Sequence, residues 1–287
     1  MLPKWWTLKN MLLLAIAGSL AALLSISSAQ SAVQYPVLAL FNSQNGAPLG
    51  QGHVAMHQGH LFVPSAPDAG APGGGFSFFD ISNPRQPQLV SQTFNAQTHP
   101  LRESHTFGVS GNIFAMQSTE GIMFWDMGDI QSPQLLHHMN LPGVNEADYG
   151  GAWWLHWQNP YLYLATLEGG LYIINTSDIE NPILVNRLLP GDLGMAPRGA
   201  FVLGNLLVMA QDKRVATFDI SHPADPVRLD SLETELAYAW MLNGDLMLGA
   251  GLNGQLIIVD VSDPNALKLA SSHNLLGARG GLHQCAR

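Results

Sequence analysis

Short apolar runs, each followed by turn residues, recur along most of the chain. They are rich in β-branched and aromatic residues, which favours strands over helices. In five places such a run ends at a polar residue, and these are Asp80, Asp126, Asn175, Asp219 and Asp260. Successive members are 46, 49, 44 and 41 residues apart. A period of about 40–50 residues is typical of the four-stranded blades of a β-propeller.

Residues 104–140 show how one repeat divides into four strands. Apolar runs cover 105–110, 113–118, 122–126 and 134–139, with turns between them. Glycine adopts positive φ at little cost, so Gly121 marks a tight hairpin. Asn253-Gly254 is the same signal in the last repeat, where we expect a strand at 246–251 before it, and in the third repeat we expect a strand at 161–166 followed by a turn at 168–170. We predict an all-β fold, a β-propeller of four-stranded blades. The five repeats cover roughly 53–100, 101–150, 151–196, 197–236 and 237–278, and a partial repeat covers 279–287.

The polar residue that ends each third strand is interpreted as structural. A short Asp or Asn side chain can accept hydrogen bonds from backbone N–H groups of the following turn. The alternative is a set of metal-binding carboxylates. One carboxylate per blade would be spread around a ring, which disfavours a shared metal.

The first 29 residues have the pattern of a secretory signal peptide. Lys4 and Lys9 precede an apolar run at 11–24, and small residues end at Ala29. We expect cleavage after Ala29 and a propeller domain over 30–287, in the periplasm or outside the cell, including its surface. A retained membrane anchor is the alternative, although the run is shorter than the roughly 20 residues of a span. Membrane contact is expected only through an uncleaved leader.

The two ends of the repeat array raise a question of ring closure. Residues 35–53 align with 86–105, so a fourth strand at 37–42 precedes the first full repeat. Residues 278–287 resemble the start of another first strand. We expect the chain to be the N-terminal part of a longer propeller, or a shortened copy of one. The alternative is a complete five-bladed ring, closed by strand 37–42, with a loose tail.

Composition excludes several classes of protein. Hydrophobic residues make up 47% of the chain and charged residues 11%, which indicates a folded protein. The net charge is −9, from 12 basic and 21 acidic residues, so the basic footprint of a nucleic-acid binder is missing. The single cysteine, Cys285, can form no intrachain disulfide.

The candidate chemistry lies on the first strands, which line the central channel of a propeller. We align the five repeats on the turn residues Gly59, Gly111, Pro160, Gly204 and Gly244. In each repeat we then compare the residue six positions before the turn residue. These residues are His53, His105, Trp154, Arg198 and Tyr238. His53 and His105 could bind a transition metal, completed by a carboxylate from Glu103, Glu146 or Asp148, and Arg198 could hold an anion. In the alternative, the five side chains bond to loops or water, and no cofactor is required.

An aromatic cluster at 153–157 is the second candidate feature. Strand alternation places Trp153, Leu155 and Trp157 on one face, and Trp154 and His156 on the other. Packing between blades explains such a cluster. The alternative is a stacking platform for a sugar or peptide.

The repeated stretch, GQLIIVDVSDPNALKL at 254–269 and GFSFFDISNPRQPQLV at 75–90, is similar to the LVIVD repeat of secreted and surface bacterial proteins. The resemblance covers roughly 35–287 and implies a β-propeller. The chain departs from the repeat pattern at 127–129, Asn175 and His222. The motif residues are structural, so the resemblance leaves the activity open.

No nucleophile elbow, zinc-protease motif, EF-hand loop or P-loop is present. We therefore expect a non-catalytic binding or interaction module for a protein, small molecule or carbohydrate. One alternative is a secreted metal-dependent hydrolase or oxidoreductase at the channel mouth. Another is a surface adhesion or structural protein.

Overall fold

The computed structural model describes residues 50–51, 54–66, 75–94, 107–118, 120–144, 154–211, 213–252 and 254–274. The chain divides into two units, Met1–Leu40 and Phe41–Arg287, and all described residues belong to the second. The predicted leader at 1–29, the strand at 37–42 and the partial repeat at 279–287 lie outside these ranges. Within them, no helix is both long and apolar enough to cross a membrane.

Five antiparallel sheets follow one another along the described chain, and we call them blades 1 to 5. Blade 1 contains β1 (Gly50–Gln51), β2 (Ala55–His57), β3 (His60–Ala66), β4 (Gly75–Asp80) and β5 (Gln88–Phe94). Blade 2 contains β6 (Phe107–Ser110), β7 (Ile113–Gln117), β8 (Gly121–Asp126) and β9 (Gln134–Asn140). Blade 3 contains β10 (Trp154–Gln158), β11 (Tyr161–Thr166), β12 (Gly170–Asn175) and β13 (Ile183–Leu188). Blade 4 contains β14 (Gly199–Leu203), β15 (Leu206–Gln211), β16 (Arg214–Asp219) and β17 (Val227–Glu233). Blade 5 contains β18 (Leu236–Asn243), β19 (Leu246–Gly251), β20 (Gln255–Asp260) and β21 (Lys268–Asn274).

These sheets confirm the predicted all-β class and the four strands per repeat. Strands predicted at 161–166 and 246–251 are β11 and β19 with the same bounds. Blade 1 has an extra piece because β1 and β2 both pair with β3, and so divide the first-strand position between them. The turn predicted at 168–170 takes the form of a 3-10 helix, η2 (Leu167–Gly169). A short helix that the pattern did not predict, α2 (Pro190–Leu193), follows β13.

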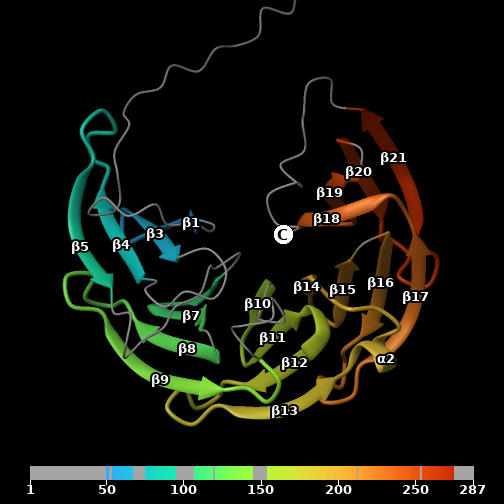
Figure 1. Cartoon of the computed structure of the whole chain (residues 1–287), viewed down its shortest axis with the longest axis horizontal. Helices are drawn as coiled ribbons and strands as arrows, with labels where there is room; N and C mark the ends of the chain where they lie inside the picture. The colour runs from blue at the N-terminus through green and yellow to red at the C-terminus, as the bar shows by residue number, and fades with distance from the viewer. Residues whose placement is uncertain are drawn as a thin grey trace, which may run out of the picture. The chain divides into compact units, whose positions relative to one another are not determined.

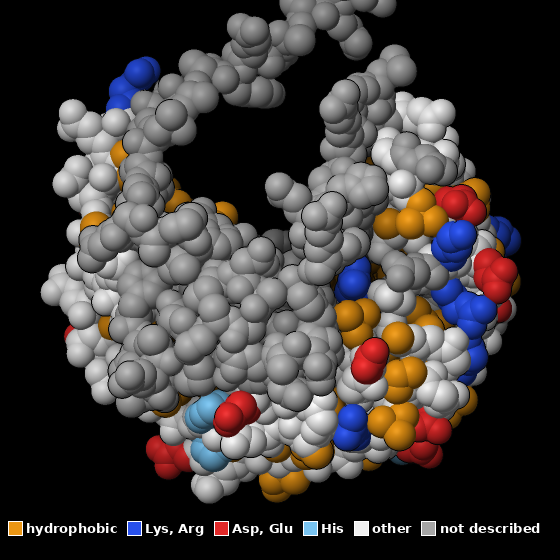
Figure 2. Space-filling model, in the orientation of Figure 1, with side chains coloured by type: hydrophobic (Ala, Val, Ile, Leu, Met, Phe, Trp, Pro, Cys, Tyr) orange, Lys and Arg blue, Asp and Glu red, His pale blue; other side chains and the backbone are white. Residues whose placement is uncertain are grey.

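Each blade presents its first strand inward and its fourth strand outward (Figure 1). The first strands contact one another, β6 with β10, β10 with β14 and β14 with β18. The fourth strands are the most exposed, as in β21, where most side chains are accessible. Acidic and basic side chains are mixed on the surface around the outer strand β17 (Figure 2).

Neighbouring blades are held together by shared apolar cores. Between blades 1 and 2 the core includes Phe62, Phe78 and Phe114, and the rings of Phe62 and Phe114 are 4.9 Å apart. Separate cores join blades 2 and 3, 3 and 4, and 4 and 5. Because the middle sheets are covered on both faces, consecutive residues of their third strands are buried, for example Ile122 to Trp125.

The polar residue at the end of each third strand closes the same turn in every blade. Its side-chain oxygen accepts a hydrogen bond from the backbone N–H two residues later. The donor–acceptor distances are 2.7 Å at Asp80, 2.7 Å at Asp126, 2.9 Å at Asn175, 2.8 Å at Asp219 and 2.9 Å at Asp260. In blades 2 to 5, the residue directly after the polar residue donates its backbone N–H to a carbonyl oxygen in the turn between the first two strands. Val261, for example, donates to Asp245 O at 2.8 Å.

These hydrogen bonds favour the ionised carboxylates. The backbone of Ser82 lowers the pKa of Asp80 below its ordinary 3.8, and the backbone of Ser221 does the same for Asp219. The side chain and backbone of Ser262 lower the pKa of Asp260. A carboxyl whose pKa is lower in the folded state contributes stability above its unfolded pKa and loses that contribution as the pH falls through the folded pKa.

The first prediction concerns acid stability. The triple variant Asp80→Asn, Asp219→Asn, Asp260→Asn keeps a turn acceptor, as Asn175 does in blade 3, but removes the three titrating groups. We expect the parent chain to lose more stability than this variant between pH 6 and pH 3. Urea unfolding at both pH values measures the difference. Equal losses in the two proteins would contradict the prediction.

The second prediction concerns the approach of blade 3 to blade 2. A Cβ atom at Gly108 would lie 2.7 Å from Leu155 Cδ2 and 2.8 Å from Trp157 Cβ. Gly108→Ala should therefore lower the free energy of unfolding by about 1–3 kcal/mol, as overpacking does. Gly191→Ala is the control because a Cβ atom there meets nothing within 4 Å. Urea denaturation of both variants tests this, and equal stability would count against it.

Candidate functional site

Inner-strand residues from all five blades surround one pocket. Its volume is about 330 Å³. The lining residues are Val54, Phe107, Trp154, Leu155, His156, Phe201, Met241 and Leu242. Val54 directly precedes β2, and the others lie on β6, β10, β14 and β18. We call this the central pocket.

The hairpins between the first two strands determine which side chains reach the central pocket. Each hairpin has a two-residue turn, at 58–59, 111–112, 159–160, 204–205 and 244–245. His156, Phe201 and Met241 all lie three residues before the first turn residue. The corresponding residue of blade 2 is Gly108, which lets blade 3 approach closely. Blade 2 contributes the neighbouring residue Phe107 to the pocket instead.

The described side chains that line the central pocket are mostly apolar, although polar atoms supply slightly more than half of its accessible surface. Trp154 packs against Phe201 with ring centroids 5.0 Å apart. Met241 is 50% exposed and Val54 55% exposed, so two apolar side chains of the lining face solvent. Such a surface suits an apolar or aromatic group.

His156 is the titratable side chain among the described residues that line this pocket. Burial lowers its pKa below the ordinary 6.5. At pH 7 the ring is therefore neutral, with one nitrogen donating and the other accepting a hydrogen bond. An entering ligand would meet an apolar wall with one polar anchor.

The structure describes three of the five channel-mouth candidates, one of them only through its backbone. Trp154 lines the central pocket. Arg198 is half-buried directly before β14, and its backbone N–H donates to Ala210 O at 3.4 Å. Tyr238 pairs through its backbone with Ala250, and its side chain lies outside the described atoms. His53 and His105 lie outside the described residues.

Trp154 and Tyr238 occupy equivalent backbone positions. Trp154 pairs with Ala165, and a β-bulge between Ala239 and Met241 lets Tyr238 pair with Ala250, which is likewise the fifth residue of its strand. In blade 4 the corresponding position is Gly199, which pairs with Ala210, so Arg198 lies one residue earlier. The grouping of the five residues at one ring position stays a prediction.

The metal hypothesis remains a prediction. Its ligands His53 and His105, and the carboxylates Glu103, Glu146 and Asp148, all lie outside the described residues. Among the residues that are described, no group of three or more His, Cys, Asp or Glu side chains could hold a metal ion.

The aromatic cluster of blade 3 packs between blades. Leu155 and Trp157 face blade 2, where the Trp157 ring meets Phe124 edge-on at 5.8 Å. Trp157 Nε1–H donates to Thr176 Oγ1 at 3.0 Å. Trp154 points the other way, toward the core shared with blade 4. Trp153 lies outside the described residues.

Sequence reasoning did not select His156, Phe201 and Met241 as one set. The turn residues Gly59, Gly111, Pro160, Gly204 and Gly244 do not all occupy the same position of the two-residue turn. Counting from the two-residue hairpin would have aligned the three residues. That count requires the strand pairing, which the sequence alone does not provide.

Comparison with known proteins supports the fold. The LVIVD repeat family matches residues 150–189 and 250–274. The computationally designed Ika8 protein is similar in structure, with a TM-score of 0.52 and 16% identity over 78% of this chain and 61% of that one. The periplasmic gluconolactonase PpgL of Pseudomonas aeruginosa has a TM-score of 0.55 and 15% identity over 75% of this chain and 67% of that one. The chain thus spans about three-fifths of the designed protein. No curated protein matches the sequence.

The third prediction tests the environment of His156. Its pKa is lower in the folded state, so the unfolded chain binds the proton more readily, and stability falls as the pH drops below 6.5. His156→Leu should flatten the dependence of stability on pH between pH 5 and pH 7. Urea midpoints across this range provide the measurement.

His222→Leu is the matched control for this prediction. His222 lies exposed in a turn. This variant should keep the parent slope. A parent slope retained by His156→Leu would show that the burial of His156 has no such effect.

Proposed function

We propose that this LVIVD-repeat β-propeller is a non-catalytic binding module whose central pocket holds an apolar or aromatic group of its ligand. One observation carries the proposal. The inner strands of all five blades contribute side chains to a single pocket of about 330 Å³. Pockets of this size and apolar character are typical of small-ligand sites.

The chemistry of the lining supports binding over catalysis. Among the described residues, the lining includes one titratable side chain, His156, and seven apolar ones. Acid–base or nucleophilic catalysis usually pairs a nucleophile or acid with a base, and a single neutral imidazole supplies half of such a pair. His156 is better suited to orient a bound group by one hydrogen bond.

The expected setting is the periplasm or the cell exterior, including the cell surface. The signal-like pattern of residues 1–29 supports this location. The ligand would then be a small molecule, a carbohydrate with an apolar substituent, or an exposed side chain of a partner protein. Nucleic acid is disfavoured by the net charge of −9.

A secreted metal-dependent hydrolase or oxidoreductase is the second candidate. It is motivated by His53 and His105, which the sequence places before the first strands of blades 1 and 2. The likeness to a periplasmic gluconolactonase concerns the fold alone at 15% identity. Elemental analysis of the purified chain separates the two candidates. About one equivalent of a transition metal, lost in His53→Ala, His105→Ala, would favour the enzyme.

The fourth prediction tests binding in the central pocket. Indole is a suitable small aromatic probe, and saturation-transfer NMR detects its binding. Met241→Arg places a long charged side chain at the pocket and should weaken indole binding by at least about tenfold. Leu203→Arg is the matched control, because Leu203 is 54% exposed on the inner strand β14 but does not line the pocket.

The outcomes are distinct. Transfer to indole that is lost in Met241→Arg and kept in Leu203→Arg supports the proposal. Equal transfer in both variants, or none in the parent chain, would overturn it.

A further inference from the structure

We call the boundary between two neighbouring blades a seam, and the residues that connect the fourth strand of one blade to the first strand of the next its link. The seams differ in which side chains of the link fill them. Between blades 2 and 3, the link that follows β9 contributes Leu141 and Val144 to the shared core. They are 4% and 8% exposed. Tyr172 adds its ring there, and its hydroxyl donates to Pro142 O at 2.6 Å. This seam is closed by apolar side chains of the link.

The seam between blades 3 and 4 is closed in the same way. The link that follows β13 forms α2 and contributes Leu193 and Met195 to the core. They pack in the same core as Ala216 of β16. A small residue on the strand is thus complemented by two larger residues from the link.

The seam between blades 4 and 5 has no such plug. Its link is only Thr234-Glu235, because β17 ends at Glu233 and β18 begins at Leu236. The link is held flat against the β15–β16 hairpin by two hydrogen bonds, Thr234 N–H to Lys213 O at 2.7 Å and Lys213 N–H to Leu236 O at 2.6 Å. Neither Thr234 nor Glu235 can supply an apolar plug.

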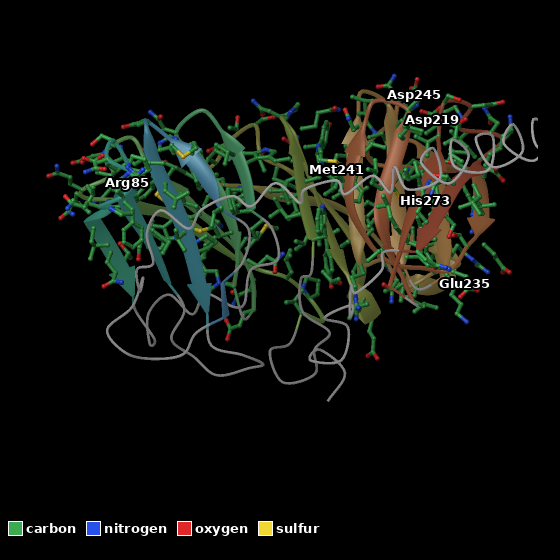
Figure 3. All side chains as sticks on the ribbon, turned by 90° about the horizontal axis from the view of Figure 1, so that it is seen from above. Arg85, Asp219, Glu235, Met241, Asp245 and His273 are labelled. Carbon is green, nitrogen blue, oxygen red and sulfur yellow. The ribbon has the colours of Figure 1, made fainter. Side chains whose placement is uncertain are left out.

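A pocket of about 360 Å³ lies in this seam, and we call it the seam pocket. Its lining residues are Lys213, Glu233, Thr234, Glu235, Gln255, Ile257, Leu269 and Ser272. It opens at the end of the blades that carries Glu235, opposite the end that carries Asp219 and Asp245 (Figure 3). It shares no lining residue with the central pocket.

Two buried polar atoms of the seam pocket have no hydrogen-bond partner among the described residues. They are Thr234 Oγ1 and Gln255 Oε1. A buried acceptor without a partner costs free energy, so native proteins keep few of them. Each of the two atoms is less than 1 Å² exposed, so a ligand's hydroxyl or amine group would meet it only after the side chain turns toward the pocket.

The hairpin between β15 and β16 also contributes to the seam pocket. Lys213 lies in the two-residue turn between the paired residues Gln211 and Arg214, and it has the positive φ, 67°, that is usual in such turns. Lys213 lines the seam pocket.

The charges around the seam pocket nearly balance. Glu233 forms an ion pair with Arg214 at 2.9 Å, and Lys213 and Glu235 add one charge of each sign. A neutral ligand with many hydrogen-bonding groups matches this set better than an ion. Ile257 is buried and Leu269 is 50% exposed, so the pocket also offers an aliphatic surface.

We propose that the seam pocket binds a neutral pyranose, either free or at the end of a glycan. The hydroxyl groups of a pyranose both donate and accept hydrogen bonds, and its C–H face is apolar. The carboxylates, Thr234 and Gln255 would accept and orient the hydroxyls, while Ile257 and Leu269 would contact the C–H face. This second site is independent of the function proposed for the central pocket.

The fifth prediction tests this site with four sugars: the methyl glycosides of glucose, galactose and mannose, and N-acetylglucosamine. Saturation-transfer NMR at millimolar sugar should show binding of at least one. Gln255→Leu removes an unpaired buried acceptor, so it should weaken that binding by about tenfold while the melting temperature stays equal or rises. A purely structural glutamine would lower the melting temperature when replaced.

A matched pair of variants locates the site. Ser272 pairs with Ile257 on β20, and Ser231 pairs with Ala216 at the same place on β16. Ser272→Tyr fills the seam pocket and should abolish sugar binding, whereas Ser231→Tyr should keep it. Circular dichroism shows that each variant retains its sheets.

Two outcomes would overturn the proposal. One is the absence of saturation transfer to all four sugars in the folded parent chain. The other is transfer that survives in the folded Gln255→Leu or Ser272→Tyr variant. Met241→Arg should leave sugar binding unchanged, so failure of the central-pocket proposal is distinguished from failure of this one.

Discussion

The structure depends on sheets that are apolar on both faces. Met123 and Phe124 are neighbours on β8, point to opposite faces and are both fully buried. Fully burying one such side chain contributes roughly 1.5–3 kcal/mol, so leaving either face in water would be costly. Each middle sheet therefore packs between two others, and the first strands of successive blades come into contact. The central pocket follows from the same packing, because Phe107, Leu155 and Phe201 of its lining also belong to the shared cores.

The repeated turn and the central pocket have different roles. The polar residue that ends each third strand accepts a hydrogen bond from the backbone N–H two residues later. In blades 2 to 5, the residue directly after the polar one donates its backbone N–H to the turn of the first hairpin. These bonds lie at the exposed end of the blade that carries Asp219 and Asp245 (Figure 3). They fix the shape of each blade and use the motif's polar atoms for that purpose. The most recognisable part of the sequence is thus structural, and ligand chemistry falls to residues outside the motif.

Variation among the blades lies in the links between them. Where a link is long, as before β14, it folds an apolar plug into the seam. Where it is two residues long, as between β17 and β18, the seam keeps a pocket. Blade 5 also differs from the middle blades, since Ile257 and Val259 of β20 are buried while Leu256 and Ile258 are half-buried. A repeat fold can therefore acquire separate sites without any change to its repeated residues.

The sequence alone determined the class of fold, the four strands of each repeat and the bounds of strands such as β11 and β19. These features depend on period-2 alternation and turn residues, which are local properties. Trp154 was also selected from the sequence, but its partners His156, Phe201 and Met241 were not. The tertiary structure decided that set, because side chains alternate at every residue and an error of one position in register exchanges the faces. It also decided the seam pocket, since a cavity depends on the volumes that two blades and their link bring to one place.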